Sequence, residues 1–244
     1  RYMLGNIKDN FEEIDFKKVD LNELPELEQF MLHKLYSLDV NFKKYFKNYD
    51  FHNLYKELLN FCTVDLSAFY FDIRKDSLYC DPIDSKNRKS TILLLNIILN
   101  SLLKWFAPIL SFTTEEIYRL LFKDSKSVHL EKFLNFPNNF ENEKLYQKWL
   151  ELIKIRNICN ISIEEKRANK EIGSSLEADL NIHLDKKLEE ITKNIDFSEL
   201  CITSKAEIYF NENLETSAQT TKAKGTKCTL CWKISENACD RDHC

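Results

Sequence analysis

Helix-breaking residues are scarce along this chain. Glycine occurs three times and proline four times in 244 residues, well below their usual shares of about 7% and 5%. Because these two residues are the least compatible with a helix interior, long stretches can run as uninterrupted helix. Hydrophobic residues make up 43% of the chain and charged residues 30%, which is enough to bury a core and to solvate a surface. The sequence predicts a mainly helical globular protein.

Apolar residues in the first half recur at three- and four-residue spacing, the period of one helix face. On the first predicted helix, residues 25–45, they are Leu27, Phe30, Met31, Leu35, Leu38 and Phe42. A second helix follows Asp50, a candidate N-cap, with Phe51, Leu54, Leu58, Phe61, Cys62, Leu66, Phe69 and Ile73 on one side. Ser85 is a candidate cap for a third helix that ends near Pro108, and Thr113 with Glu116 forms a candidate capping box for a fourth. Antiparallel helices with short connections predict a bundle.

The apolar run "TILLLNIILNSLLKWFAPIL" approaches the ~20 residues that a membrane span needs. It contains Asn96, Asn100 and Lys104, and polar groups at these depths are costly in lipid. We therefore predict the central helix of a bundle and no membrane partner. The chain starts at Arg1 without a signal peptide, and we expect it to be part of a longer protein.

The pattern changes after Pro137. A charged helix is predicted from about residue 143 to 170, with Gly173 as its left-handed stop. Residues 176–184 alternate apolar and polar, as a half-buried strand does, and a short helix over 185–192 follows. Further strands are predicted near residues 200–203 and 206–210, and a linker over 211–225. We expect a helical bundle over 1–136, a junction with a small α/β subdomain over 137–217, and a linker with a cysteine tail over 218–244.

The tail "KCTLCWKISENACDRDHC" holds four cysteines in eighteen residues. The other four cysteines are single and scattered, as in reduced cytosolic proteins, which argues against disulfides and for a cytoplasmic protein. A redox Cys-x-x-Cys would follow a strand in a βαβ unit, and no such strand precedes this one. Two thiolates of a Cys-x-x-Cys can bind one zinc ion at ~2.3 Å, and so short a tail needs a metal to fold.

The predicted Zn²⁺ ligands are Cys228, Cys231, Cys239 and Cys244. The second pair is less regular than the first, because four residues separate its members and His243 competes with them. A cysteine beyond Cys244 could also displace Cys239. A site closed by four protein ligands is structural and not catalytic.

Five stretches, in this order, carry a resemblance: "RYMLGN", "YDFHNLYKELLNFCTVDLSAFYFDIRKDSLYCD", "APILSFTTEEIY", "EIGSSLEA" and the terminal "CTLCW". Together they resemble the C-terminal third of bacterial-type isoleucyl-tRNA synthetases, over essentially the whole chain. The family's second cysteine pair is also a Cys-x-x-Cys, and this sequence departs from it there.

The resemblance implies that the bundle is an anticodon-binding domain of a class I synthetase and that the cysteine tail is a zinc domain holding the anticodon loop. The implied partners are an isoleucine-accepting tRNA and the catalytic and editing domains of the same chain, and we expect a monomer. In the family, ATP binds to segments that precede this region. The three glycines here are isolated, so no phosphate-binding strand–glycine–helix unit is present in the sequence, and we expect no catalysis.

A formal charge of −4 argues against binding RNA through bulk electrostatics, so any RNA site must be local. Trp232 follows the first cysteine pair between Lys227 and Lys233. These three residues are the predicted tRNA contacts, with Trp232 stacking on a base of the anticodon loop. An equal alternative is that Trp232 covers the metal cluster as a hydrophobic lid.

The long helix carries Arg156, Arg167 and Lys170 among several glutamates, and we expect a salt-bridged face there and not an RNA groove. Two alternative functions remain. One is a free-standing zinc-containing RNA-binding adaptor. The other is the equivalent region of a valyl- or leucyl-tRNA synthetase.

Overall fold

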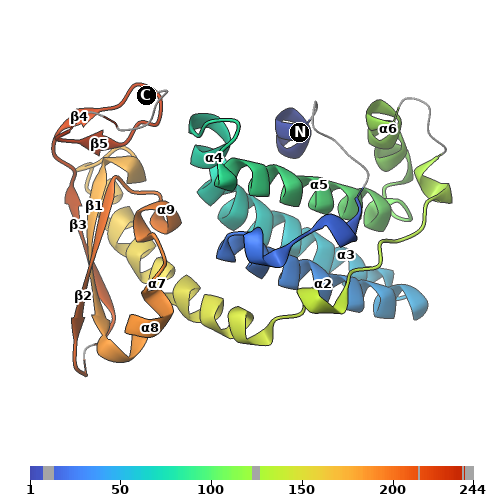
Figure 1. The fold of residues 1–244 in the computed structure, drawn as a ribbon, viewed down its shortest axis with the longest axis horizontal. Helices are drawn as coiled ribbons and strands as arrows, with labels where there is room; N and C mark the ends of the chain where they lie inside the picture. The colour runs from blue at the N-terminus through green and yellow to red at the C-terminus, as the bar shows by residue number, and fades with distance from the viewer. Residues whose placement is uncertain (8–13, 123–126, 214, 238, 240–244) are drawn as a thin grey trace. The chain divides into compact units, whose positions relative to one another are not determined.

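The computed structural model describes residues 1–7, 14–122, 127–213, 215–237 and 239 (Figure 1). The chain divides into two compact units, Arg1–Glu143 and Lys144–Cys244. A helical unit followed by a smaller α/β unit confirms the predicted fold class. The finer division into bundle, junction and tail stays a prediction.

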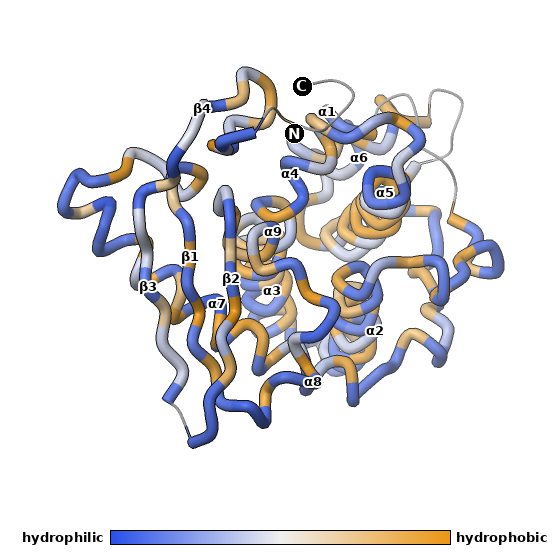
Figure 2. Tube along the Cα trace, turned by 60° about the vertical axis from the view of Figure 1, so that its left-hand side comes forward, coloured by the Kyte–Doolittle hydropathy of each residue, from blue (hydrophilic) through white to orange (hydrophobic). Residues whose placement is uncertain are grey.

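Unit 1 consists of helices of three kinds. The α-helices are α1 (Tyr2–Ile7), α2 (Glu26–Lys47), α3 (Phe51–Asn60), α4 (Phe71–Cys80), α5 (Lys86–Phe106) and α6 (Ser111–Leu121). The 3₁₀ turns are η1 (Phe16–Lys18), η2 (Leu21–Glu23), η4 (Val128–Leu130) and η5 (Asn138–Phe140), and η3 (Phe61–Tyr70) is a π-helix. In Figure 2 the hydrophobic colour concentrates in α2, α3 and α5.

Local sequence signals set most of these boundaries. All six apolar residues predicted for the buried side of α2 are buried. The Asp50 side chain accepts a hydrogen bond from the Asn53 amide at the start of α3, and the Ser85 hydroxyl accepts one from the Arg88 amide at the start of α5. Both predicted caps are confirmed.

Two expectations in this unit are wrong. The capping box at Thr113 does not form, because α6 already begins at Ser111. Glu115 in this helix instead accepts hydrogen bonds from Arg119, Ser127 and the Val128 amide, so its carboxylate ties α6 to η4. Phe51 was predicted to face the core and is 41% exposed.

The segments α3, η3 and α4 follow one another without a break from Phe51 to Cys80. At the end of η3 the Phe71 amide donates to the carbonyl of Leu66, five residues back, as in a π-turn. The buried positions change their spacing accordingly, from four residues between Leu54 and Leu58 to five between Phe61 and Leu66. The sequence predicted the helix but not its wider turns.

A buried ion pair lies inside this unit. The Arg74 guanidinium on α4 binds the Glu28 carboxylate on α2 through two contacts, Nε to Oε1 at 2.7 Å and Nη2 to Oε2 at 2.6 Å. The Tyr70 hydroxyl donates to the same carboxylate at 3.0 Å. The pKa of Tyr70 lies well above its ordinary value, mainly because the side chain is buried. Three buried polar side chains therefore satisfy one another between α2 and the η3–α4 segment.

Among the helices in the described part of the chain, none is both long and apolar enough to cross a membrane. The apolar run predicted as a central helix lies mostly in α5, and most of its residues are buried within unit 1.

Unit 2 is a mixed α/β structure. Its helical segments are α7 (Glu143–Ala168, whose first residue belongs to unit 1), η6 (Ser175–Glu177), η7 (Lys186–Leu188), α8 (Glu189–Thr192) and α9 (Phe197–Cys201). Its strands are β1 (Ala178–Asp185), β2 (Lys205–Asn211), β3 (Ser217–Lys222), β4 (Thr226–Lys227) and β5 (Ile234–Ser235). One sheet has the order β2-β1-β3, and β4 and β5 form a separate hairpin.

The three-stranded sheet buries one face. Strand β1 pairs in parallel with β2 and antiparallel with β3. Its alternate residues Ala178, Leu180, Ile182 and Leu184 are buried, as the alternating pattern predicted. The Ser162 hydroxyl on α7 is hydrogen-bonded to that of Thr220, which pairs with Leu180 across the sheet. Because directly paired residues share a face, α7 covers the apolar side of the sheet.

Three sequence predictions are wrong in unit 2. The left-handed stop of α7 is Lys170, with φ 58°, and not Gly173. Residues 200–203 are not a strand, because Asp196 caps α9 through the amides of Ser198 and Glu199 and the left-handed Ile202 ends that helix. The predicted linker over 211–225 contains β3, whose backbone is paired with β1 although its residues are polar.

Candidate metal and nucleic-acid site

The predicted metal ligands lie on and after the β4–β5 hairpin. Thr226 pairs with Ser235, and Lys227 pairs with Ile234. Gly225 precedes the hairpin with φ +123°, and a Cβ atom there would lie 2.1 Å from the Ser235 carbonyl oxygen. Only glycine fits at this position, for both conformational and steric reasons.

The hairpin brings three cysteines together. The sulfur atoms of Cys228, Cys231 and Cys239 all lie within 4.8 Å of one another. Those of Cys231 and Cys239 are 3.9 Å apart, much longer than the ~2.0 Å of a disulfide bond. The Leu230 amide donates a hydrogen bond to the Cys228 sulfur, with 3.4 Å between the nitrogen and the sulfur. The three side chains therefore form a cluster of cysteines that no disulfide joins.

This geometry fits a tetrahedral metal site. Four ligands placed ~2.3 Å from a zinc ion are about 3.8 Å from one another, close to the measured Cys231–Cys239 separation. An amide that donates to a ligand sulfur is the kind of outer contact that orients metal ligands. The cluster can thus hold a metal ion. Cys244, the fourth predicted ligand, and its competitor His243 lie outside the described residues.

The three predicted RNA contacts are close to this cluster. Trp232 follows Cys231 in a left-handed conformation, with φ 64°. Its side chain is 59% exposed, and the Lys227 ammonium lies 5.5 Å from the centre of its ring. Cys228 donates its amide hydrogen to the Lys233 carbonyl at 2.9 Å, which closes the turn. The structure places an exposed aromatic ring and two lysines on the cysteine-bearing hairpin.

A cavity of about 890 Å³ lies between the hairpin and the sheet. The hairpin contributes Lys227 and Lys233 to its wall, and the sheet contributes Asp179 from β1 and Lys205 from β2. Burial raises the pKa of Asp179, against the opposing effect of Lys205. A hydrogen bond to Glu207 is the main cause of the raised pKa of Lys205. The sequence did not indicate that the sheet lines this cavity, because Asp179 and Lys205 are far from the hairpin in the chain.

Ser204 is another residue that the sequence analysis did not identify. Its hydroxyl donates to the Leu176 carbonyl at 2.5 Å and accepts from the Ile234 amide at 2.7 Å. Its own amide donates to the Ala178 carbonyl. One serine thus connects β5 of the hairpin to the chain at the start of β1. An isolated serine carries no local signal for such a role.

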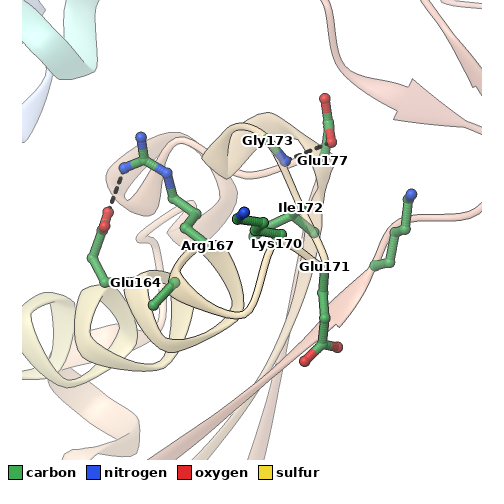
Figure 3. A pocket seen from close by; sticks show the side chains of 9 residues that line it. Glu164, Arg167, Lys170, Glu171, Ile172, Gly173 and Glu177 are labelled. Carbon is green, nitrogen blue, oxygen red and sulfur yellow. Dashed lines mark hydrogen bonds and ion pairs between the residues drawn. The ribbon is translucent and has the colours of Figure 1, made fainter.

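Of the basic residues predicted on a salt-bridged face of α7, Arg167 forms an ion pair and Arg156 is buried instead. Arg156 donates to the Leu200 carbonyl and is buried. Arg167 pairs with Glu164 at 2.6 Å beside a cavity of about 680 Å³ at the end of the helix, which Lys170 also lines (Figure 3). Two lysines of α7 also form ion pairs, Lys154 with Glu151 and Lys166 with Glu171.

The comparisons with known proteins point to one family. A model described as "Anticodon-binding domain of tRNA ligase" matches residues 28–182. The isoleucine–tRNA ligase of Pelagibacter ubique is 63% identical over 241 residues, which are 99% of this chain and 27% of that protein. The corresponding ligases of Bartonella henselae and Agrobacterium fabrum are 38% and 37% identical, over 97% and 96% of the chain. The chain spans about a quarter of the length of these relatives.

Proposed function

Since the chain belongs to the family of anticodon-binding domains of tRNA ligases, we propose that it is the part of an isoleucine–tRNA ligase that recognises the anticodon of tRNA. The observation that carries this proposal is the family match, which runs from α2 through α7 and into β1. The three relatives described above are named isoleucine–tRNA ligases, which supports isoleucine over valine or leucine. A complete ligase of this kind uses ATP to attach isoleucine to its tRNA. We assign that chemistry and the editing reaction to other domains of the same cytoplasmic, monomeric enzyme.

In this proposal the cysteine cluster binds a structural Zn²⁺. Cys228, Cys231 and Cys239 supply three thiolates, and Cys244 is the expected fourth ligand. The spacing of the sulfur atoms supports this assignment. The metal would stabilise the turn that carries Trp232, since few side chains of the hairpin are buried.

Trp232 is proposed to stack on an unpaired base of the anticodon loop. Because Trp232 is an exposed residue, at 59%, we favour stacking over the alternative role as a lid on the cluster. Lys227 and Lys233 flank the ring in sequence and would hold the adjacent RNA backbone. Unpaired bases are commonly bound in this way, by an aromatic face with basic side chains beside it.

The test compares binding of the zinc-loaded protein to isoleucine tRNA and to the same tRNA with a replaced anticodon, at one fixed salt concentration. We expect the wild-type protein to prefer the natural anticodon. Trp232→Ala should lose about 1–3 kcal/mol, or about five- to 150-fold in affinity, with its zinc retained. Leu230→Ala is the matched control, because Leu230 is an exposed apolar residue of the same turn. Equal binding of the two tRNAs would disprove anticodon recognition by this chain.

A further inference from the structure

The cavity between the hairpin and the sheet has a basic lining. Lysines reach it from three places: Lys205 at the start of β2, Lys224 before the hairpin, and Lys227 and Lys233 on the hairpin itself. Two carboxylates, Asp179 and Glu236, also line it. The balance is positive in a chain whose formal charge is −4.

Three of the four lysines are available to a ligand. Lys205 is engaged with Glu207 at 2.6 Å. Within the described residues, no carboxylate forms an ion pair with Lys224, Lys227 or Lys233. Positive side chains that converge on one cavity without a carboxylate to neutralise them are suited to bind an anion.

The walls of the cavity are held in place. The two hydrogen bonds of the Ser204 hydroxyl fix β5 to the chain that leads into β1. The Thr226–Ser235 and Lys227–Ile234 pairs hold the two strands of the hairpin together, and Gly225 leaves the room that the Ser235 carbonyl needs. Because these contacts involve the backbone, they hold the segments that carry Lys205, Lys227 and Lys233 next to one another.

The cavity is also adjacent to the exposed ring. Lys227 lines the cavity and lies over the face of Trp232, 5.5 Å from its centre. Within a nucleotide only the ribose separates the base from its phosphate. A base stacked on Trp232 would therefore bring a phosphate within reach of the lysines.

We propose that this cavity binds a phosphodiester group of the RNA backbone next to the base that stacks on Trp232. The proposal rests on the proposed function and adds a ligand chemistry and two residues, Lys224 and Lys205, to it. Lys224 and Lys233 bind the phosphate oxygens directly, Lys227 bridges ring and phosphate, and Lys205 contributes charge from the sheet. A competing explanation is that the lysines only neutralise the metal-bound thiolates, and it predicts a loss of metal from lysine variants.

The first experiment measures the affinity of the zinc-loaded protein for an anticodon stem-loop RNA over a series of salt concentrations. Each phosphate contact on single-stranded RNA contributes about 0.7 to the slope of log affinity against log salt. Lys224→Gln/Lys233→Gln should lower the magnitude of that slope by about 1.4. The matched control is Lys186→Gln/Lys187→Gln, which removes the same charge from η7 at the far end of β1 and should leave most of the slope unchanged.

The second experiment replaces single phosphates of the RNA loop by uncharged methylphosphonates. At one position the replacement should weaken binding to the wild-type protein several-fold and leave binding to the Lys224→Gln/Lys233→Gln variant unchanged. Zinc content is measured for every variant and should stay constant.

The outcomes separate this proposal from the one that it rests on. If the cavity variant behaves like the control while Trp232→Ala still weakens binding, the phosphate site is wrong and anticodon recognition stands. If the cavity variant loses zinc, the lysines serve the metal and the phosphate site is wrong. If the wild-type protein does not distinguish the natural stem-loop from one with a replaced anticodon, both proposals are wrong.

Discussion

The helical unit and the cysteine-bearing hairpin differ in what can stabilise them. Helices α2 and α5 bury large side chains such as Phe30, Phe42 and Trp105. Between Gly225 and Cys239, by contrast, Cys231 is the one buried side chain in the described part of the hairpin. A bundle with a large core distributes its stability over many contacts, whereas a hairpin without a core depends on a few strong ones. Single substitutions should therefore affect the two regions very differently.

The largest effect is expected from Cys231→Ser. Structural zinc sites contribute about 10–16 kcal/mol of apparent binding free energy, so loss of this ligand should release the metal and unfold the hairpin. The helical signal in circular dichroism should stay unchanged, since the bundle has its own core. Zinc content and the change in tryptophan fluorescence are the measurements, and a chelator should reproduce the effect on wild-type protein.

Cys62→Ser is the control for this prediction. Cys62 is a single thiol in η3, and burial raises its pKa to about 11. This variant should keep its zinc. A Cys231→Ser protein that retains zinc and native fluorescence would show that the hairpin folds without the metal.

Arg74→Leu should have the largest effect within the bundle. Removing one partner of a buried ion pair typically costs about 3–5 kcal/mol, because the other charge is left without a partner. Urea unfolding gives the change in free energy. Lys75→Leu, which removes an exposed ion pair with Asp72, is the control and should cost at most about 1 kcal/mol. Similar values for the two variants would contradict a stabilising role of the Glu28–Arg74 pair, and neither should change zinc content.

Caps should have smaller effects that stay local to the bundle. Ser85→Ala removes the hydrogen bond to the Arg88 amide and should cost about 1 kcal/mol. Thr113→Ala should be close to neutral, since Thr113 lies inside α6 and does not cap it. Thermal unfolding of the two variants in parallel tests this, and a loss at Thr113 as large as at Ser85 would contradict the observed start of α6.

The smallest expected effect is a pH dependence from His33. Burial lowers its pKa, with Glu143 and Glu141 opposing the change, and its Nδ1 accepts a hydrogen bond from the Asn142 amide at 2.9 Å. The folded protein therefore binds a proton less readily than the unfolded chain. Stability from neutral His33 is present above about pH 6.5, the unfolded pKa, and is lost as the pH falls toward the folded value.

His33→Gln tests this dependence, because glutamine can also accept the Asn142 hydrogen bond but does not titrate. Unfolding free energies of both proteins are measured from pH 7.5 to about 5, around the ordinary histidine pKa. The wild type should lose more stability than the variant in this range. Parallel curves would assign the pH dependence to other groups.

Features with a local signal could be predicted from the sequence. The buried side of α2, the caps Asp50 and Ser85, and the alternation along β1 each depend on residues a few positions apart. The cysteine cluster belongs to the same class, because its three described members lie within twelve residues.

Features that depend on distant residues were missed. Glu28 and Arg74 are 46 positions apart, and Ser204 and Ile234 are 30 apart. Strand β3 is polar, and only its pairing with β1 makes it a strand. Lys170 and Ile202 occupy the left-handed conformation, which usually favours glycine. The sequence therefore predicted a helix stop at Gly173 and a strand over 200–203 instead.

The π-helical segment η3 bears on how this protein tolerates changes in chain length. In an ordinary α-helix each residue advances by about 100°, so the 16 positions between Leu58 and Arg74 would place these side chains on nearly opposite sides. The wider turns of η3 absorb the excess, and both residues are buried. Loss of one residue within η3 can close a wide turn into an ordinary one and leave Arg74 facing Glu28. The same deletion in the middle of α2 would turn the rest of that helix away from its neighbours, so a one-residue deletion should be tolerated better in η3 than in α2.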